Sequence, residues 1–230
     1  MNTDINLMRR RMIVPSLLKF ISAFIFIGVL LFVPAGTIHY PNAWIYIAGM
    51  MIPMSFVLVF LLAKDPELLE KRLNTKEKET EQKRYVGLSL VLFLITFIIP
   101  GFDFRFGWSH VPQWLVIVAL ILMLTGYGMF IGVILQNRYA SRVIEIQKEQ
   151  KLIDSGLYGI VRHPMYLAAT ILYLSSPIIL GSYYAIIPML FLPFLLAYRI
   201  LNEEKILKEG LPGYREYTEK VKFRMIPYIW

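Results

Sequence analysis

The amino-acid sequence predicts an all-α, polytopic membrane protein with about six transmembrane helices. Hydrophobic residues make up 57% of its 230 residues, whereas soluble domains hold roughly half. Asp, Glu, Lys and Arg are missing from four long runs, each close to or above the roughly 20 residues that cross a bilayer. The basic residues concentrate in the segments between them. The four runs are residues 20–63, 85–102, 106–137 and 163–198.

These runs predict six helices in chain order. The first run is long enough for two crossings, and no small-residue cleavage pattern follows its first half. We therefore interpret that half as a retained span rather than a signal peptide. The last run holds two shorter helices, because Gly181-Ser182 breaks it near its middle. The expected helices are about 18–39, 43–63, 86–101, 113–135, 164–180 and 184–201.

The distribution of basic residues predicts the orientation of these helices. All but one of the 24 Lys and Arg residues lie in segments that six crossings place on the same side. The exception is Arg105, in the loop between the third and fourth helices. Because cytoplasmic loops carry the excess of Lys and Arg, both termini are expected in the cytoplasm.

The most hydrophilic segment is 64–85, which leaves two interpretations open. Asp65-Pro66 has the character of a helix start, and Glu67, Leu68, Leu69 and Leu73 would then lie along an amphipathic helix at the membrane interface. A solvated loop is equally consistent with the composition. In the fourth helix, Gly126, Gly128 and Gly132 favour close helix packing over space for a ligand.

Composition excludes several classes of function. The chain has no cysteine, so it has no disulfides, thiolate ligands or thiol nucleophile. The formal net charge of +8 does not indicate nucleic-acid binding, because acidic residues are mixed in and no recognition module is present. Attraction to anionic membrane lipid explains the excess more simply. His39 and His110 fall on the opposite face from His163, so no metal site is expected.

A polar cluster at the two feet of the last predicted hairpin is the candidate functional site. The long polar segment 136–162 ends in a turn at Asp154-Ser155-Gly156, and Pro164 suits the first turn of a helix. Folding of the hairpin brings the two feet together at one membrane face. Charges at this depth are costly and are retained mainly for function. The residues at the feet are Arg162, His163, Arg199, Glu203 and Glu204.

Each of these residues also has a simpler interpretation. His163 is consistent with a helix cap, and Glu203-Glu204 with the solvated start of a polar tail. Arg199 is either a side chain that snorkels to the headgroups or a fixed cation that binds a carboxylate or phosphate. The residues alone therefore indicate a membrane protein of one domain, 1–230, with a polar site at its cytoplasmic face.

Three strings in this half of the chain carry a family resemblance. They are Gly156-Leu-Tyr-Gly-Ile-Val-Arg-His-Pro-Met-Tyr166, Arg199-Ile-Leu-Asn-Glu203-Glu204 and Pro212-Gly213-Tyr214-Arg215-Glu216-Tyr217. In order and spacing they resemble the isoprenylcysteine carboxyl methyltransferase family, part of a membrane superfamily that includes phospholipid N-methyltransferases. The resemblance covers roughly 135–230. Gly101-Phe-Asp-Phe-Arg-Phe-Gly-Trp108 is similar to bacterial members, which implies the bacterial inner membrane.

The resemblance implies S-adenosylmethionine-dependent methyl transfer to a lipophilic acceptor at the cytoplasmic face. A methyltransferase-like catalytic core would occupy 136–230, after four helices within 18–135. Arg199 would position the acceptor, with Arg162 and Glu204 as secondary candidates. By analogy the cofactor would contact Gln150, Lys151, Leu152, Ile153, Tyr158, His163, Pro164, Met165, Tyr166 and Glu203. The sequence departs from the family at Gln150, where better-known members have His, and at Val143, where they have Gln.

The residue types suit the groups of this cofactor. Tyr158 and Tyr166 offer aromatic faces to the adenine or the sulfonium cation, and Glu203 accepts hydrogen bonds from the amine or the ribose. The start of the helix at Pro164 is expected to favour a carboxylate. A carboxylate acceptor needs no base, whereas an amine acceptor must lose a proton to His163, Glu203 or Glu204.

Carboxyl O-methylation of the isoprenylcysteine type is the first expectation, and three alternatives stay open. In the first alternative, the acceptor is a phospholipid or small amphiphile that is N-methylated. Alternatively, the chain is an NADPH-dependent reductase of the sterol-reductase type, whose members share an Arg-His-Pro-x-Tyr-like segment and an ending similar to Phe223-Arg-Met-Ile-Pro-Tyr-Ile-Trp230. The last alternative is a lipid-binding membrane protein without catalysis.

Overall fold

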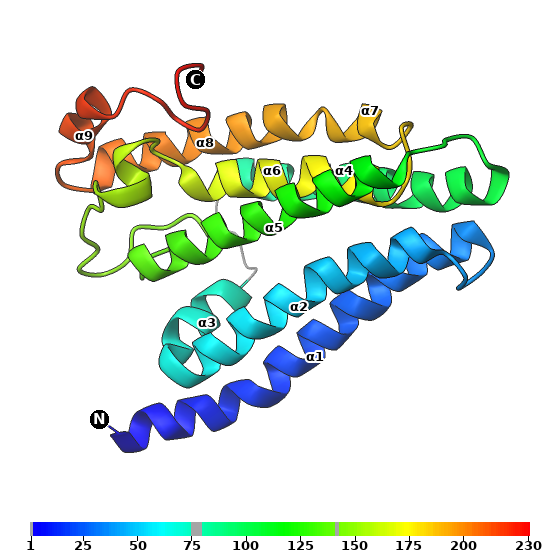
Figure 1. Cartoon of the computed structure of the whole chain (residues 1–230). Coiled ribbons are helices and arrows are strands. Elements are labelled where there is room, and N and C mark those ends of the chain that lie inside the picture. Colours follow the sequence, from blue (N-terminus) through cyan, green and yellow to red (C-terminus); the bar gives the residue numbers. More distant parts are fainter. Residues whose placement is uncertain (1, 75–79, 141–142) are drawn as a thin grey trace.

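The computed structural model describes residues 2–74, 80–140 and 143–230, with side chains from Leu7 onward. Long helices run roughly along one direction and form an elongated bundle (Figure 1). Both ends of the drawn chain lie at the same end of this bundle (Figure 1). The long helices are α1 (Asn2–Ala35), α2 (Pro41–Lys64), α4 (Thr80–Phe106), α5 (Gln113–Gln136), α6 (Pro164–Ile179) and α8 (Leu192–Gly210).

The chain is an all-α, multi-pass membrane protein. Within the described residues, five helical segments are long and apolar enough to cross a bilayer, and α6 is a shorter apolar helix. The fifth segment, Ile186–Gly210, joins the single turn α7 (Ile186–Met189) to α8. The predicted helix 184–201 is therefore interrupted, because Pro188 and Pro193 both lack the N–H that a continuous helix requires.

The predicted helix limits were wrong where they relied on charged residues. α1 begins at Asn2 rather than near residue 18 and ends at Ala35, where Gly36 takes a φ of +69°. α4 extends beyond the predicted 86–101 at both ends. Charged residues mark the edge of the bilayer, and a helix continues past that edge into water.

The segment after α2 folds as the short helix α3 (Pro66–Leu73). The side chain of Asp65 accepts a hydrogen bond of 3.1 Å from Leu68 N, and Pro66 occupies the first turn. Leu68 and Leu69 are buried in a cluster with residues of α1, α2 and α5. The helix interpretation is therefore correct, but its apolar face packs on the protein. Residues 75–79 of the predicted loop lie outside the described residues.

Close packing of α5 against α6 depends on Gly126. A Cβ atom there would lie 3.0 Å from Ala168 O and 3.1 Å from Leu172 N. The predicted packing role is thus confirmed at this glycine. A Cβ atom at Gly128 would meet no atom of another described segment within 4 Å, and one at Gly132 would meet the side chain of Leu157 at 3.5 Å.

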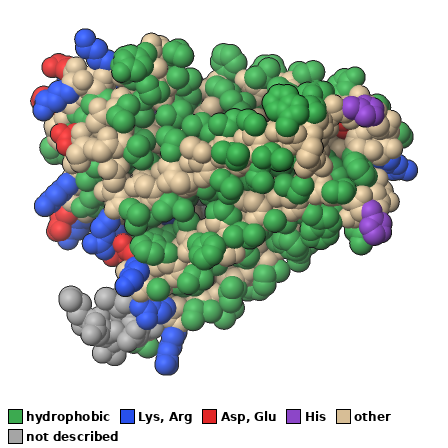
Figure 2. All heavy atoms as spheres, viewed as in Figure 1, with side chains coloured by type: hydrophobic (Ala, Val, Ile, Leu, Met, Phe, Trp, Pro, Cys, Tyr) green, Lys and Arg blue, Asp and Glu red, His purple; other side chains and the backbone are tan. Residues whose placement is uncertain are grey.

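The surface divides into a charged end and an apolar flank. Lys and Arg side chains gather at the end that holds both chain ends, and hydrophobic side chains cover the flank between (Figure 2). Phe56, Val59 and Trp114 are among the exposed apolar residues, as expected for a lipid-facing surface. The gathering of Lys and Arg at one end agrees with the prediction that nearly all basic residues lie on one side of the membrane. That this side faces the cytoplasm stays a prediction.

A buried carboxylate organises the end remote from these charges. Asp103 is 1% exposed and accepts hydrogen bonds of 2.7 Å from both the backbone N and the Oγ of Ser109. The hydroxyl of Ser182 donates to the same carboxylate. Asp103 thereby joins the end of α4 to the turn between α6 and α7 and fixes the tip of the hairpin.

Candidate functional site

The foot of α6 is shaped by a short turn and anchored by a distant segment. The 3-10 helix η1 (Gly156–Gly159) begins with Gly156 at a φ of +57°, a conformation that favours glycine. His163 then stands at the N-cap of α6, and Pro164 is its first residue, as predicted. The backbone N of His163 donates to Arg224 O at 2.7 Å, so the segment after α9 (Tyr214–Lys220) holds this foot.

The two feet of the hairpin meet, as the sequence predicts. The hydroxyl of Tyr166 on α6 donates to Glu203 Oε2 at 2.7 Å. Arg199 Nε donates to the same hydroxyl at 2.9 Å. Arg199 is 6% exposed, and its guanidinium lies 4.7 Å from the ring centre of Tyr85 on α4, a cation–π contact. Arg199 therefore lies at the seam between α4 and α8, one side chain from Glu203.

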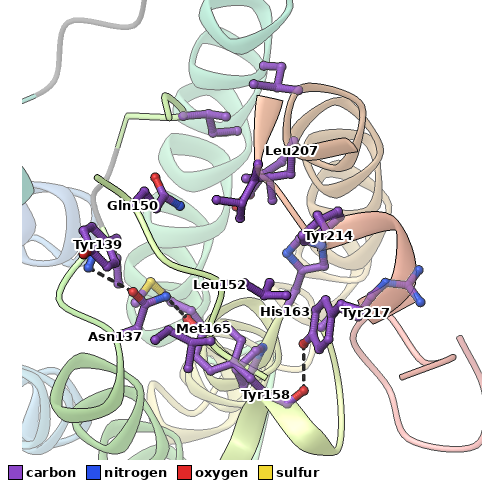
Figure 3. Close-up of a pocket in the computed structure, with 18 of the residues that line it drawn as sticks. Asn137, Tyr139, Gln150, Leu152, Tyr158, His163, Met165, Leu207, Tyr214 and Tyr217 are labelled. Carbon is purple, nitrogen blue, oxygen red and sulfur yellow. Dashed lines mark hydrogen bonds between the residues drawn. The ribbon is translucent and has the colours of Figure 1, made fainter. Parts of the chain in front are cut away.

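A cavity of about 120 Å³ opens beside these residues, well above the roughly 10–15 Å³ that one water occupies (Figure 3). Its walls come from the loop after α5, η1, the start of α6, α8 and α9. All the residues predicted to contact the cofactor line this cavity, and so does Arg162. They are Gln150, Lys151, Leu152, Ile153, Tyr158, His163, Pro164, Met165, Tyr166 and Glu203.

Two predicted residues lie behind the cavity wall. Arg199 is not among the residues that line the cavity, but it donates a hydrogen bond to Tyr166, which lines it. Glu204 is 2% exposed and points away, with Oε1 2.6 Å from Arg162 Nε and Oε2 3.1 Å from Arg224 Nε. His163 Nε2 lies 3.4 Å from Oε1. This carboxylate is thus surrounded by positive or polar groups and organises the foot of α6.

The start of α6 offers less to an anion than the sequence predicts. Pro164 has no N–H, and the backbone N of Tyr166 donates to His163 O at 3.1 Å. The backbone N of His163 already donates a hydrogen bond to Arg224 O. Two of the N–H groups at this foot are therefore already bonded within the protein, and a third is absent at Pro164.

Tyr158 is held by two contacts and keeps its own proton. Its hydroxyl accepts a hydrogen bond of 2.8 Å from Asn137 Nδ2, and its carbonyl accepts one of 2.7 Å from the hydroxyl of Tyr217 (Figure 3). Burial raises the pKa of Tyr158 to about 12, and the bond from Asn137 acts in the opposite direction. The phenol is therefore neutral at physiological pH and able to donate to a ligand.

Sequence reasoning missed several wall residues. Tyr214 is 3% exposed, and its hydroxyl finds no hydrogen-bond partner in the part of the chain that the structure describes. Leu207 lies four residues after Glu203, hence on the same face of α8. Tyr214 and Tyr217 belong to the string that carried the family resemblance, which was the available signal. Val143 lines the cavity with an apolar side chain.

This donor set fits a molecule with a polar head and an aromatic base. Glu203 supplies a hydrogen-bond acceptor, Tyr158 a donor, and Tyr166 an aromatic face, while the buried hydroxyl of Tyr214 is unpaired within residues 80–140 and 143–230 and the other described residues. Over the described residues, no group of three or more His, Asp or Glu side chains could hold a metal ion.

Comparison with known proteins agrees with this arrangement. Residues 114–212 match the model of the phospholipid methyltransferase family, PEMT, a match that includes the hairpin and most of the cavity wall. A segment of 84 residues is 33% identical to Delta(14)-sterol reductase of Mus musculus. That segment is 35% of this chain and only 20% of the reductase.

The fold is similar to that of a solved membrane enzyme. The eukaryotic intramembrane Ras methyltransferase ICMT (isoprenylcysteine carboxyl methyltransferase), solved without a monobody, superposes with a TM-score of 0.57 at 21% identity. The superposition covers 89% of this chain and 74% of the other. The expected resemblance to this superfamily is therefore confirmed, and the structural likeness itself concerns the fold.

Proposed function

We propose that this protein transfers a methyl group from S-adenosylmethionine to a lipophilic acceptor at the cytoplasmic membrane face, because residues 114–212 match the model of the phospholipid methyltransferase family. The observation that carries the proposal is that all the residues implied for the cofactor line one cavity at the feet of the hairpin. The buried hydroxyl of Tyr214, which has no hydrogen-bond partner among the described residues, also supports a polar ligand there.

Different residues of the cavity wall would bind different groups of the cofactor. When bound, S-adenosylmethionine supplies an electrophilic methyl group on a sulfonium. Glu203 accepts from the amine or the ribose hydroxyls, and Tyr158 donates from its neutral phenol. Tyr166 offers its ring to the adenine or to positive charge. Rigid placement matters most, because a displacement reaction gains its rate largely from alignment.

We infer that the acceptor is a carboxylate, as in the isoprenylcysteine type of reaction. Arg199 supports this assignment, because a guanidinium binds a carboxylate with two parallel hydrogen bonds. Its position at the α4–α8 seam, bonded to Tyr166, holds a fixed cation beside the cavity. A carboxylate is already nucleophilic, so no protein base is required.

The match to the phospholipid methyltransferase family favours a second candidate, N-methylation of a lipid amine. An amine acceptor must lose a proton, and Glu204 is a poor base because Arg162 and Arg224 hold both of its oxygens. Glu203 or His163 would then take the proton, since both line the cavity.

The test is transfer of labelled methyl from S-adenosylmethionine by purified protein in detergent. Acceptors are a prenylated cysteine analogue with a free carboxylate, phosphatidylethanolamine, and total membrane lipid extract, with products identified by mass. A base-labile methyl ester supports O-methylation, and a base-stable N-methyl product supports the second candidate. NADPH-dependent reduction would indicate the sterol-reductase type instead. If none of the assays gives a product, the remaining alternative is a lipid-binding role without catalysis.

A further inference from the structure

Residues 221–226, the crossing segment, pass over the foot of α6 after α9 ends. Arg162 N donates to Phe223 O at 2.9 Å, and His163 N donates to Arg224 O at 2.7 Å. The guanidinium of Arg162 adds a bond of 2.7 Å to Val221 O. Two backbone hydrogen bonds therefore join the crossing segment to the foot of α6, although about 60 residues separate them along the chain.

Glu204 connects the same two segments through its two oxygens. Oε1 accepts from Arg162 Nε at 2.6 Å, while Oε2 accepts from Arg224 Nε at 3.1 Å. Lys208 Nζ is also near Oε2, but at 3.7 Å. The carboxylate of Glu204 is 2% exposed, and a buried charge depends on all its partners. Loss of Arg224 would leave Oε2 with only the longer contact.

The crossing segment is itself held in place on both sides of Arg224. Met225 is 2% exposed and packs in a cluster with Leu196 and Ile200 of α8. The Arg224 guanidinium lies 5.2 Å from the ring centre of Trp230. Met225 and Trp230 thus help to orient Arg224 toward Glu204, and the side chain of Arg224 is 30% exposed.

We propose that Arg224 is a positioning residue for the cofactor cavity. Arg224 does not line the cavity, whereas Arg162 and His163 do. It acts through Glu204 and through its own backbone carbonyl, which together fix the direction of those two side chains. The inference rests on the proposed function, since it concerns how the same cavity is ordered for S-adenosylmethionine.

The test uses the full chain with Arg224→Gln, and Arg215→Gln as the matched control. Arg215 is exposed on α9 and donates to Lys208 O at 3.2 Å, outside the Glu204 contacts. We expect the Kd for S-adenosylhomocysteine and the KM for S-adenosylmethionine to rise about tenfold in Arg224→Gln, while kcat at saturation stays within about twofold. Arg215→Gln should keep the values of the unsubstituted protein.

Two further variants separate positioning from a general loss of structure. Arg224→Lys restores the charge and should recover most of the affinity, measured as Kd by titration so that unfolded protein does not count. In a double-mutant cycle with Glu204→Gln, the combined rise in Kd should be smaller than the product of the single effects. Multiplicative effects would overturn the proposal.

The outcomes also distinguish the two proposals. If the unsubstituted protein binds S-adenosylhomocysteine but Arg224→Gln binds it equally well, the positioning role is wrong and the function stands. If kcat falls while KM is unchanged, Arg224 affects a step other than cofactor binding, which contradicts this role. If the unsubstituted protein binds no S-adenosylhomocysteine, the proposed function fails, and the positioning role fails with it.

Discussion

The hydroxyl of Tyr166 donates to Glu203 Oε2 at 2.7 Å and thereby joins α6 to α8 at the cavity wall. Arg199, one turn before Glu203, donates to the same hydroxyl at 2.9 Å. A cation, a phenol and a carboxylate thus form a chain from the α4–α8 seam to the cavity. In the proposed reaction, Arg199 faces the acceptor side and Glu203 the cofactor side, so substitutions at the two residues should have different effects.

Glu203→Gln should weaken cofactor binding. The amide keeps a hydrogen-bond acceptor but loses the charge, and hydrogen bonds to charged groups contribute about 1.5–3 kcal/mol. The Kd for S-adenosylhomocysteine is expected to rise about ten- to one-hundredfold in a calorimetric titration. Glu209→Gln, an exposed position on the same helix, is the control and should have no effect. Equal affinity in both variants would contradict the assignment of Glu203.

Arg199→Lys should impair turnover more than cofactor binding. Lysine keeps the positive charge but cannot reproduce the planar, two-pronged donor of the guanidinium. We expect kcat with the acceptor to fall about tenfold or more, with the Kd for S-adenosylhomocysteine within about twofold of the original. A loss of affinity equal to the loss of kcat would instead place Arg199 on the cofactor side.

The meeting of the two feet was predictable because the membrane restricts the chain so strongly. The charge-free run between Arg162 and Arg199 is long enough for two short crossings, which bring both feet to one face. The family resemblance then implied which loop lies beside them. Tyr214 and Arg224 were not singled out, because they lie beyond the last membrane helix, where no bilayer constraint or apolar periodicity indicates how the chain folds back.

The order of the long helices was predicted, but five described segments rather than six are long and apolar enough to cross a bilayer, and the helix ends were predicted less well. Hydropathy locates the part of a helix within lipid, and α1 and α4 continue past it. The packing of α3 on α1, α2 and α5 also escaped prediction, because an amphipathic pattern is the same whether its apolar face meets lipid or protein. Asp103 was missed for a similar reason, since its partners come from two separate loops.

Gly126→Ala and Gly128→Ala form a matched pair on α5. A methyl group at 126 would press on the backbone of α6, which should lower the free energy of unfolding by about 1–3 kcal/mol. A methyl group at 128 meets nothing within 4 Å and should stabilise the helix by up to about 1 kcal/mol. Unfolding in detergent, followed by circular dichroism, measures both. Equal effects would show that α5 and α6 are not in close contact.

Asp103→Ala should destabilise the protein without a direct effect on the cofactor site. The change leaves the buried hydroxyl of Ser182 and the N–H of Ser109 without their acceptor, a loss of about 3 kcal/mol or more. The Tm in detergent should fall, while the Kd for S-adenosylhomocysteine of the folded protein stays unchanged. The exposed residue His110 provides the control, His110→Gln. A large change in Kd would contradict a purely structural role for Asp103.

The orientation in the membrane can be tested directly, because the chain has no cysteine. Lys148→Cys and His110→Cys each introduce one thiol at an exposed position, at opposite ends of the predicted topology. A membrane-impermeant maleimide should label His110→Cys in intact cells, and Lys148→Cys only after the cells are opened. The reverse pattern would place the cavity on the outer face, where the proposed cofactor is not expected.

In the proposed function, the cavity at the feet of the α6–α8 hairpin holds the methyl donor. The decisive measurement is an experimental structure of the protein saturated with S-adenosylhomocysteine. We expect ligand density between Tyr158, His163 and Glu203, with Arg199 still bonded to Tyr166. Density at another site, or an empty cavity at saturating ligand, would contradict it.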